Sequence, residues 1–397
     1  MADMWFYGDG TERKGPVDLA TLGRLRDAGT LASATPVWRE GRQTSMPLGE
    51  VLDLLAGAPA AAPPPQRGLL GSLGGKLSEM AGVPEIGDVP VGHVLTGGLS
   101  VAGANEDIFA VGTAATTPPL SEVPAGWPRP RVWWRILLGA ILTYLLLRVG
   151  ITEFHNPNFL PGLIVIGSFV VPMSVVVFFF EMNTPANVSI YQVGKMMLLG
   201  GAAGLLITML LAEVIPGSGS SKLLPALLTG VIEESAKALA LLLVLRELRW
   251  RWQLNGLLFG AAVGAGFAGF ESAGYAWQSE GVFGSILWRG LLSPGGHVIW
   301  TAMIGAALWQ ARGSKPFSWE LLRHPLVVRR WVFAVVLHGL WDTALLPKAP
   351  LLQYAGLFVI GWYLTFAILK QALAEVGAAQ AAALAAAPAT MLAGQPA

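Results

Sequence analysis

The 397-residue chain contains no cysteine. This absence excludes disulfide bonds, thiolate zinc sites and a cysteine nucleophile, and it leaves carboxylate, imidazole and hydroxyl groups as the available chemistry. Charged residues are also scarce, at 13% of the chain against about 25% in a typical soluble domain. Hydrophobic residues make up 53% and the mean hydropathy is +0.56. With a formal net charge of only +1, we expect no nucleic-acid partner. The composition predicts a membrane protein in contact with the lipid bilayer.

The first residues lack a long apolar run and carry Asp3, Asp9 and Glu12. We therefore expect no cleavable signal peptide, and we expect the first membrane span to direct insertion. By this argument the residues that precede the span stay in the cytoplasm.

Residues 1–57 have the pattern of a small α+β soluble domain. An aromatic run at 5–7 leads into the turn residues Gly8, Asp9 and Gly10, leucines recur at helical spacing from 19 to 25, and residues 35–38 resume an extended pattern.

Residues 58–130 are rich in Ala, Pro and Gly, with few aromatic residues. Such a composition cannot bury enough apolar surface for a second core, so it predicts a flexible linker. The Ala-rich tail at 374–397 is expected to be a frayed helix or disordered.

Between these regions, residues 131–373 contain repeated hydrophobic stretches of about 20 residues, the length that crosses a bilayer. The eight stretches are 133–151, 161–180, 194–215, 223–245, 255–277, 294–311, 327–346 and 351–372. The sequence therefore predicts an all-α polytopic membrane domain of about eight transmembrane helices, preceded by the small α+β domain.

Lys and Arg are distributed unequally between the loops of the two sides. Most lie before the first stretch, after the fourth, and between the sixth and seventh, whereas the other side has Arg148, Lys222 and Lys348, with Arg289 ambiguous. The positive-inside rule then predicts a multi-pass protein of the plasma membrane with both termini in the cytoplasm.

Four of the stretches carry ionisable residues where lipid should surround them. These are Glu233, Glu234 and Lys237 in the fourth, Glu271 in the fifth, His297 in the sixth, and His338 with Asp342 in the seventh. Each charge in a bilayer core costs roughly 3 kcal/mol on insertion scales. Counting about 1.5 Å per residue from the basic flanks places them at comparable depths. We therefore expect them to face one another across one polar cavity.

The charged residues of the fourth stretch share one helix face. Lys237 falls between Glu233 and Glu234 in azimuth and lies one turn further along. The lysine can keep one carboxylate ionised while the other acts as a general base. A buried structural ion pair is the alternative.

The fifth stretch has a small residue at every fourth position, at 256, 260, 264, 268 and 272. Such a stripe allows close helix contact, which we expect to bring Glu271, on the neighbouring face beside Phe267, toward the fourth stretch. Alternatively, a protonated Glu271 bonds a backbone carbonyl.

Histidines mark the sixth and seventh stretches. Ser293 and Pro294 predict an N-cap and first turn, where the neutral imidazole of His297 would bind a metal or donate to an oxyanion, or serve as a plain hydrogen-bonding residue. His338 and Asp342 are four residues and about 40° apart, so they can share one cavity. In one interpretation Asp342 orients the imidazole, and in a second both residues are metal ligands. In a third, His338 and Asp342 only hydrogen-bond to each other and stabilise the helix.

The ordered set EExxK at 233–237, FxxxE at 267–271, isolated His297 and HxxxD at 338–342 resembles the PrsW family of intramembrane proteases, relatives of the CAAX prenyl protease superfamily. The resemblance covers roughly 130–372. It implies an intramembrane or juxtamembrane endopeptidase acting on membrane-anchored proteins such as anti-sigma factors, with cleavage on the extracytoplasmic side.

The same resemblance implies roles for the seven residues. Glu233 or Glu234, next to Lys237, would activate water, and Glu271, His297, His338 and Asp342 would bind a metal or stabilise the oxyanion. The metal ligands that it suggests are Glu271, His297 and His338. Both zinc and a metal-free glutamate mechanism fit this set.

The N-terminal domain is similar to GYF-related domains, in WFY at 5–7, GPV at 15–17, Gly29, VW at 37–38 and Gly41. Met46 replaces a tryptophan that is often found near this position. The resemblance implies a proline-rich peptide partner at an aromatic groove. Alternatively, the aromatic residues only fill the core of a small domain.

Two other classes of function compete with a protease. A proton-coupled multi-pass transporter could use Glu233, Glu271 and Asp342 as protonation switches, although no inverted repeat is evident between the two halves. A catalytically idle scaffold could present the N-terminal domain, but the complete motif set argues against it.

Overall fold

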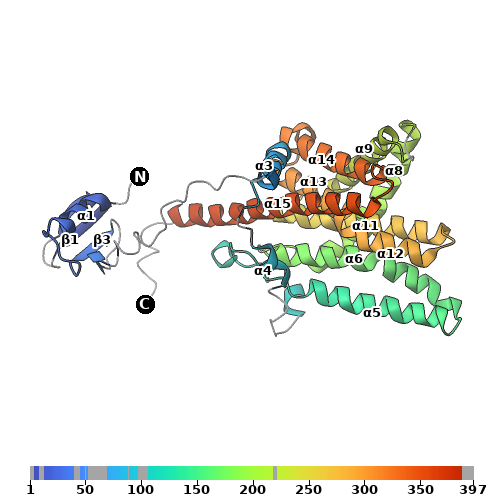
Figure 1. Ribbon diagram of the computed structural model, residues 1–397, viewed down its shortest axis with the longest axis horizontal. Helices are drawn as coiled ribbons and strands as arrows, with labels where there is room; N and C mark the ends of the chain where they lie inside the picture. The colour runs from blue at the N-terminus through green and yellow to red at the C-terminus, as the bar shows by residue number, and fades with distance from the viewer. Residues whose placement is uncertain are drawn as a thin grey trace. The chain divides into compact units, whose positions relative to one another are not determined.

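The computed structural model describes residues 4–8, 13–39, 45–49, 51, 69–87, 89–96, 106–217 and 221–386. The chain divides into two compact units, residues 1–72 and 73–397 (Figure 1).

The N-terminal unit has an antiparallel sheet in the order β2-β1-β3-β4 and one helix. Its elements are β1 (Met4–Gly8), β2 (Arg13–Asp18), α1 (Leu19–Asp27), β3 (Pro36–Arg39) and β4 (Met46–Pro47). Leu22, Val37 and Leu48 are fully buried in its core. The predicted α+β architecture is confirmed. The described residues do not include the expected turn at Asp9 and Gly10, the charged residues Asp3 and Glu12, or Gly41.

Helix α1 begins at a capping residue. The carboxylate of Asp18 accepts a hydrogen bond from the backbone N–H of Thr21 at 2.8 Å, and hydrogen bonding to Thr21 lowers the pKa of Asp18. Gly29, just after the helix, has a φ of +71°, which a glycine adopts without strain.

The second unit is helical. Its long helices are α5 (Trp133–Thr152), α6 (Leu160–Met182), α8 (Gly201–Val214), α9 (Leu223–Ala240), α11 (Gln253–Gln278), α12 (Val282–Leu292), α13 (His297–Arg312), α14 (Pro325–Asp342) and α15 (Pro350–Ala386). The other elements are α3 (Leu69–Ala81), η4 (Pro157–Phe159), α7 (Ile190–Lys195), the π-helical turn η5 (Met196–Gly200), α10 (Leu242–Leu245), and short helical turns at 91–96, 106–109, 120–122, 293–295 and 319–323.

Helices occupy all eight predicted stretches, which confirms the polytopic α-helical fold. Among the described residues, six segments are long and apolar enough to cross a membrane. The two remaining stretches are α9 and α14, and these carry more charge than the others. Five of the seven predicted site residues, Glu233, Glu234, Lys237, His338 and Asp342, thus lie in these two helices.

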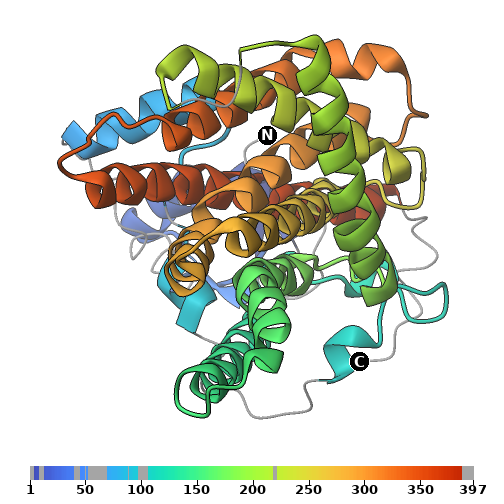
Figure 2. The same ribbon diagram turned by 90° about the vertical axis from the view of Figure 1, so that its right-hand side faces the viewer.

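Helix α11 lies at the centre of this unit, where it packs against α6, α8 and α13 (Figures 1 and 2). Most of its apolar span, 83%, is buried, whereas 6% of the span of α5 and 17% of that of α7 to α8 are buried. The outer helices expose leucines, as expected of surfaces that face lipid.

Two pairs of helices meet backbone to backbone. A Cβ at Gly256, Gly260 or Gly264 of α11 would overlap carbonyl oxygens of α13. A Cβ at Gly230 of α9 would lie 2.9 Å from the carbonyl oxygen of Val335 in α14. The small-residue stripe of α11 therefore makes close helix contact with α13, and Glu271 on the same helix lines one cavity with Glu233 of the fourth stretch.

The region expected to be a flexible linker is folded over its described part. The Tyr363 hydroxyl donates to the carbonyl oxygen of Gly74 at 3.1 Å and lies 3.0 Å from Ser78 Oγ, which ties α3 to α15. Val83 and Val94 are buried in the main core. The linker composition cannot build its own core, but its few apolar residues dock onto one that already exists.

The Ala-rich tail also differs from its prediction at its start. Helix α15 continues without a break through Ala386, and alanine has the highest helix propensity. The rest of the tail, 387–397, lies outside the described residues, as do 58–68 of the linker.

Candidate active site

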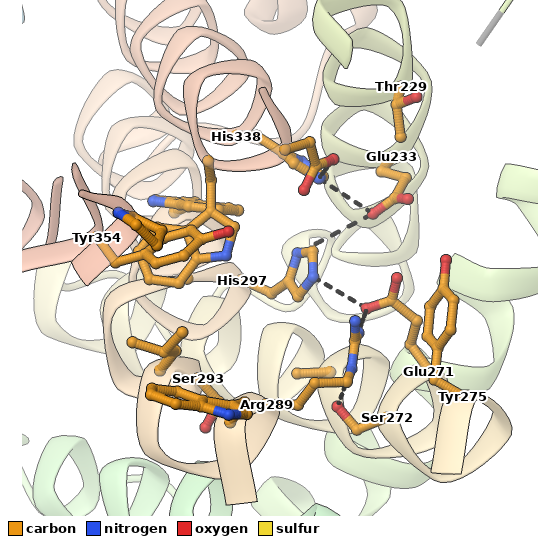
Figure 3. Close-up of a pocket in the computed structure, with 18 of the residues that line it drawn as sticks. Thr229, Glu233, Glu271, Ser272, Tyr275, Arg289, Ser293, His297, His338 and Tyr354 are labelled. Atoms are coloured by element: carbon orange, nitrogen blue, oxygen red, sulfur yellow. Dashed lines mark hydrogen bonds and ion pairs between the residues drawn. The ribbon is translucent and has the colours of Figure 1, made fainter. Parts of the chain in front are cut away.

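A cavity of about 750 Å³ opens among helices α9, α11, α12, α13, α14 and the start of α15 (Figure 3). Its ionisable lining comes from five of these elements and comprises Glu233, Glu271, Arg289, His297, His338 and Asp342. Figure 3 shows Glu233 between the two imidazole rings, with Glu271 on the far side of His297.

On α9, Glu233 and Glu234 have different surroundings. The side chain of Glu233 is 10% exposed and lines the cavity, whereas Glu234 is fully buried behind the cavity wall. Lys237 Nζ, also fully buried, lies 2.7 Å from Glu234 Oε1 and 3.5 Å from Glu233 Oε2. The shared face predicted from helical spacing therefore holds both carboxylates around one ammonium group.

On α14, each ring nitrogen of His338 faces carboxylates. Nδ1 lies 2.9 Å from Glu234 Oε1, and Nε2 lies 3.3 Å from Asp342 Oδ2 and 3.6 Å from Glu233 Oε2. The ring stacks on Trp300 with centroids 4.8 Å apart. These contacts fix the position and plane of an imidazole that is only 2% exposed.

On α13, His297 joins the two helix pairs. Its Nδ1 lies 2.9 Å from Lys237 Nζ and 4.0 Å from Glu233 Oε2, both on α9. Its Nε2 lies 3.1 Å from Glu271 Oε2 on α11. The lysine ammonium has no lone pair and can only donate, so it donates a hydrogen bond to Nδ1 of His297. The ring then donates from Nε2 to Glu271.

The sixth stretch starts differently from its prediction. Residues 293–295 form a separate 3-10 turn, and Gly296 precedes α13, so His297 is the first residue of the helix. Ser293 Oγ donates to the carbonyl oxygen of Gly290 at 3.1 Å and is not the N-cap. The prediction for Ser293 is wrong, because Pro294 and the two following glycines separate this turn from the helix.

Arg289 is a site residue that sequence reasoning missed. Its Nη2 donates to Glu271 Oε2 at 2.6 Å, its Nε donates to Ser272 Oγ at 3.1 Å, and its guanidinium lies 4.3 Å from the Tyr275 ring centroid. All three partners belong to α11. The signal in the sequence was a lone arginine on the side poor in basic residues, but α12, which carries it, was not predicted.

The structure brings all seven predicted residues together. Five cross-helix contacts of 4.0 Å or less connect α9 with α13 and α14, and α11 with α13. Glu234 and Lys237 belong to this network without lining the cavity. The catalytic roles of the seven residues remain predictions.

One group among the described residues has the donors and spacing to hold a metal ion. Glu233, His297 and His338 each offer one atom, and these atoms lie within 4.8 Å of one another. Carboxylate oxygen and imidazole nitrogen are ordinary ligands of zinc, so the donor chemistry fits. The set differs from the predicted one, in which Glu271 took the place of Glu233.

Glu271 is placed to support a ligand instead. It accepts from the nitrogen of His297 that faces away from Glu233, as carboxylates behind metal-binding histidines commonly do. Arg289 holds the same carboxylate oxygen.

Comparison with known protein families gives two matches. A family model described as PrsW family intramembrane metalloprotease matches residues 162–369, and one described as GYF domain 2 matches residues 5–54. No curated protein and no solved structure matches the chain. The first match includes all seven predicted site residues and Arg289.

Proposed function

Because the chain belongs to the PrsW family of intramembrane metalloproteases, we propose that it cleaves membrane-anchored proteins with water activated by Glu233. Family membership makes it a membrane-embedded hydrolase and decides against the transporter. The substrate class, the residue roles and the assignment of 1–57 as a binding domain and of 131–373 as the protease domain are parts of the proposal.

The choice of Glu233 as the base depends on one observation. Of the two adjacent glutamates, Glu233 alone lines the cavity, where water and substrate can reach it. Glu234 is fully buried and is occupied by Lys237 at 2.7 Å and by His338 at 2.9 Å. We assign Glu234 the role of holding these two groups in place.

The reaction that we propose is peptide hydrolysis by general base catalysis. Glu233 takes one proton from water as the water oxygen bonds to the scissile carbonyl carbon, and the carbonyl electron pair moves onto its oxygen. When this intermediate collapses, the C–N bond breaks and Glu233 returns the proton to the leaving amine. The products are a new carboxyl end and a new amino end.

Donors in the cavity would stabilise the oxyanion. His338 lines it, and an N–H placed before the reaction stabilises charge without a reorganisation cost. Glu271 keeps His297 oriented through its Nε2. A metal ion held by Glu233, His297 and His338 would polarise the scissile carbonyl, but the steps above need only the chain's own groups.

The cavity lies at one end of three helices whose other ends carry basic residues. Helices α11 and α14 begin next to Arg251 and near Arg323, and they reach the cavity at Tyr275 and Asp342. Helix α13 begins in the cavity and ends at Arg312. By the positive-inside rule, the cavity opens to the extracytoplasmic side and both termini are cytoplasmic.

The N-terminal domain supports a narrower proposal, a proline-rich peptide ligand, which GYF domains typically bind. Trp5 and Tyr7 are only partly buried against the small core, which leaves aromatic surface for such a ligand. Trp38 is 6% exposed and Arg13 lies over its ring, so it contributes less.

The decisive experiment replaces the base. Glu233→Gln keeps the size of the side chain and removes the proton acceptor, so it should lower cleavage of a membrane-anchored reporter by about 10² to 10⁴-fold. Reporter fragments and the amount of enzyme are measured by immunoblot. The matched control is Glu247→Gln, on an exposed glutamate outside the cavity. Wild-type cleavage by Glu233→Gln at equal enzyme level would refute the proposal.

A further inference from the structure

The ammonium group of Lys237 lies among the atoms that would ligate a metal. Its Nζ is 2.9 Å from His297 Nδ1 and 3.5 Å from Glu233 Oε2, and these are the His297 and Glu233 atoms that approach each other most closely. Two of the three candidate ligand residues, His297 and Glu233, therefore already contact a cation that the chain itself provides.

The position of this cation is fixed on all sides. Lys237 is fully buried, is held by Glu234 Oε1 at 2.7 Å, and lies 4.2 Å from the centroid of the Phe267 ring. A buried ammonium that leaves these partners would lose its hydrogen bonds without gaining water. The side chain thus has little freedom to move aside.

A metal ion at the same site needs the imidazole nitrogen of His297 and the carboxylate of Glu233, which the lysine now contacts. A zinc ligand must present a bare lone pair, and the lone pair of His297 Nδ1 accepts the lysine proton. A metal ion bound by this group and the Lys237 ammonium would also repel each other strongly, because both are cations in a site that excludes water.

We propose that the Lys237 ammonium and a divalent metal ion are alternative occupants of the Glu233, His297 and His338 group. In the wild-type chain the ammonium supplies the positive charge, metal binding is weak, and no metal ion takes up Glu233. Substitution of Lys237 by a neutral residue converts the group into a tighter metal site. The inference rests on the proposed active site, but its test does not depend on cleavage.

The test is Co²⁺ binding by the purified full-length chain, followed by visible absorption of the metal and by calorimetry. Lys237→Met should bind one Co²⁺ per chain at least about tenfold more tightly than wild type, within the ten- to hundredfold range that neighbours of metal ligands commonly contribute. Adding His297→Ala to Lys237→Met should remove the gain. Lys195→Met, on an exposed lysine of α7, is the matched control and should behave as wild type.

Removing one buried charge can prevent folding, so a neutral pair is tested as well. Lys237→Met with Glu234→Gln removes both members of the 2.7 Å ion pair and should also bind Co²⁺ more tightly than wild type. Equal affinity in wild type and both variants would overturn the proposal, as would the failure of all of them to bind. Failure of the proposed protease function would instead appear in the reporter assay and leave these affinities unchanged.

Discussion

Each buried charge of the site is matched by a partner on another helix. Lys237 on α9 donates to His297 on α13, and Glu234 on α9 contacts His338 on α14. Breaking a buried pair by removing one partner typically costs about 3 to 5 kcal/mol, because it leaves the other charge uncompensated. These residues therefore hold the helices together around the cavity, and activity losses must be compared with protein stability.

Arg289 allows a test that separates positioning from stability. Arg289→Gln should lower the reporter cleavage rate about ten- to hundredfold, because Glu271 loses its 2.6 Å partner and no longer orients His297. Arg289→Lys keeps a cation there and should recover part of the rate. We expect the loss in kcat and not in KM, since Arg289 holds Glu271 and not the bulk of the substrate.

The control for this series is Arg249→Gln, whose side chain is 58% exposed and does not line the cavity. Equal rates for Arg289→Gln and Arg289→Lys, or a change in KM alone, would contradict a positioning role.

At the scale of residues, the sequence predicted the site because charge is rare in apolar spans. Seven candidates stood out against lipid, and all seven meet in the structure. Helical spacing could not choose between Glu233 and Glu234 as the base, because both share the helix face of Lys237. The two residues differ in that Glu233 lines the cavity and Glu234 does not. Arg289 was missed because one arginine near a span end is ordinary.

At the scale of elements, the glycines of α11 set the position of His297. A Cβ at Gly264 would overlap the carbonyl oxygen of His297, so Gly264→Ala should push α13 away and break the contacts of His297 with Glu271 and Lys237. We expect reporter cleavage to fall at least about tenfold, since small displacements of catalytic groups are costly.

Gly274 on the same helix gives the matched control, because a Cβ there meets nothing within 4 Å. Gly274→Ala should cleave the reporter at the wild-type rate. If Gly264→Ala also keeps that rate while Glu233→Gln does not, the close packing of α11 and α13 does not position the site.

Hydropathy predicted where helices occur but not where they break. The third stretch contains a π-helical turn, η5, and the fourth ends in the separate short helix α10. Helix α12 was not predicted because its 11 residues are too few to cross a membrane, although with α13 they make one span of 31 residues. Helix α3 was assigned to the linker because its docking partner, Tyr363, lies 285 residues from Ser78 in the chain. Such long-range contacts leave no local pattern.

At the scale of the whole molecule, the lack of cysteine makes orientation directly testable. Single cysteines at Leu346, near the cavity end of α14, and at Arg249, on the basic side, would be the only thiols in the chain. An impermeant maleimide added to intact cells should label Leu346→Cys, and it should label Arg249→Cys only after permeabilisation. The reverse pattern would place the cavity on the cytoplasmic side.

The two glycine-packed helix pairs divide the seven predicted site residues between them. Glu271 and His297 belong to α11 and α13, whereas Glu233, Glu234, Lys237, His338 and Asp342 belong to α9 and α14. Close backbone packing leaves each pair little room to deform. The geometry of the site therefore depends on how the two helix pairs meet. If the pairs separate by the length of one hydrogen bond, His297 loses its contacts with Lys237 and Glu233 together. A protease built in this way loses its whole active site when the pair α11 and α13 moves away from the pair α9 and α14.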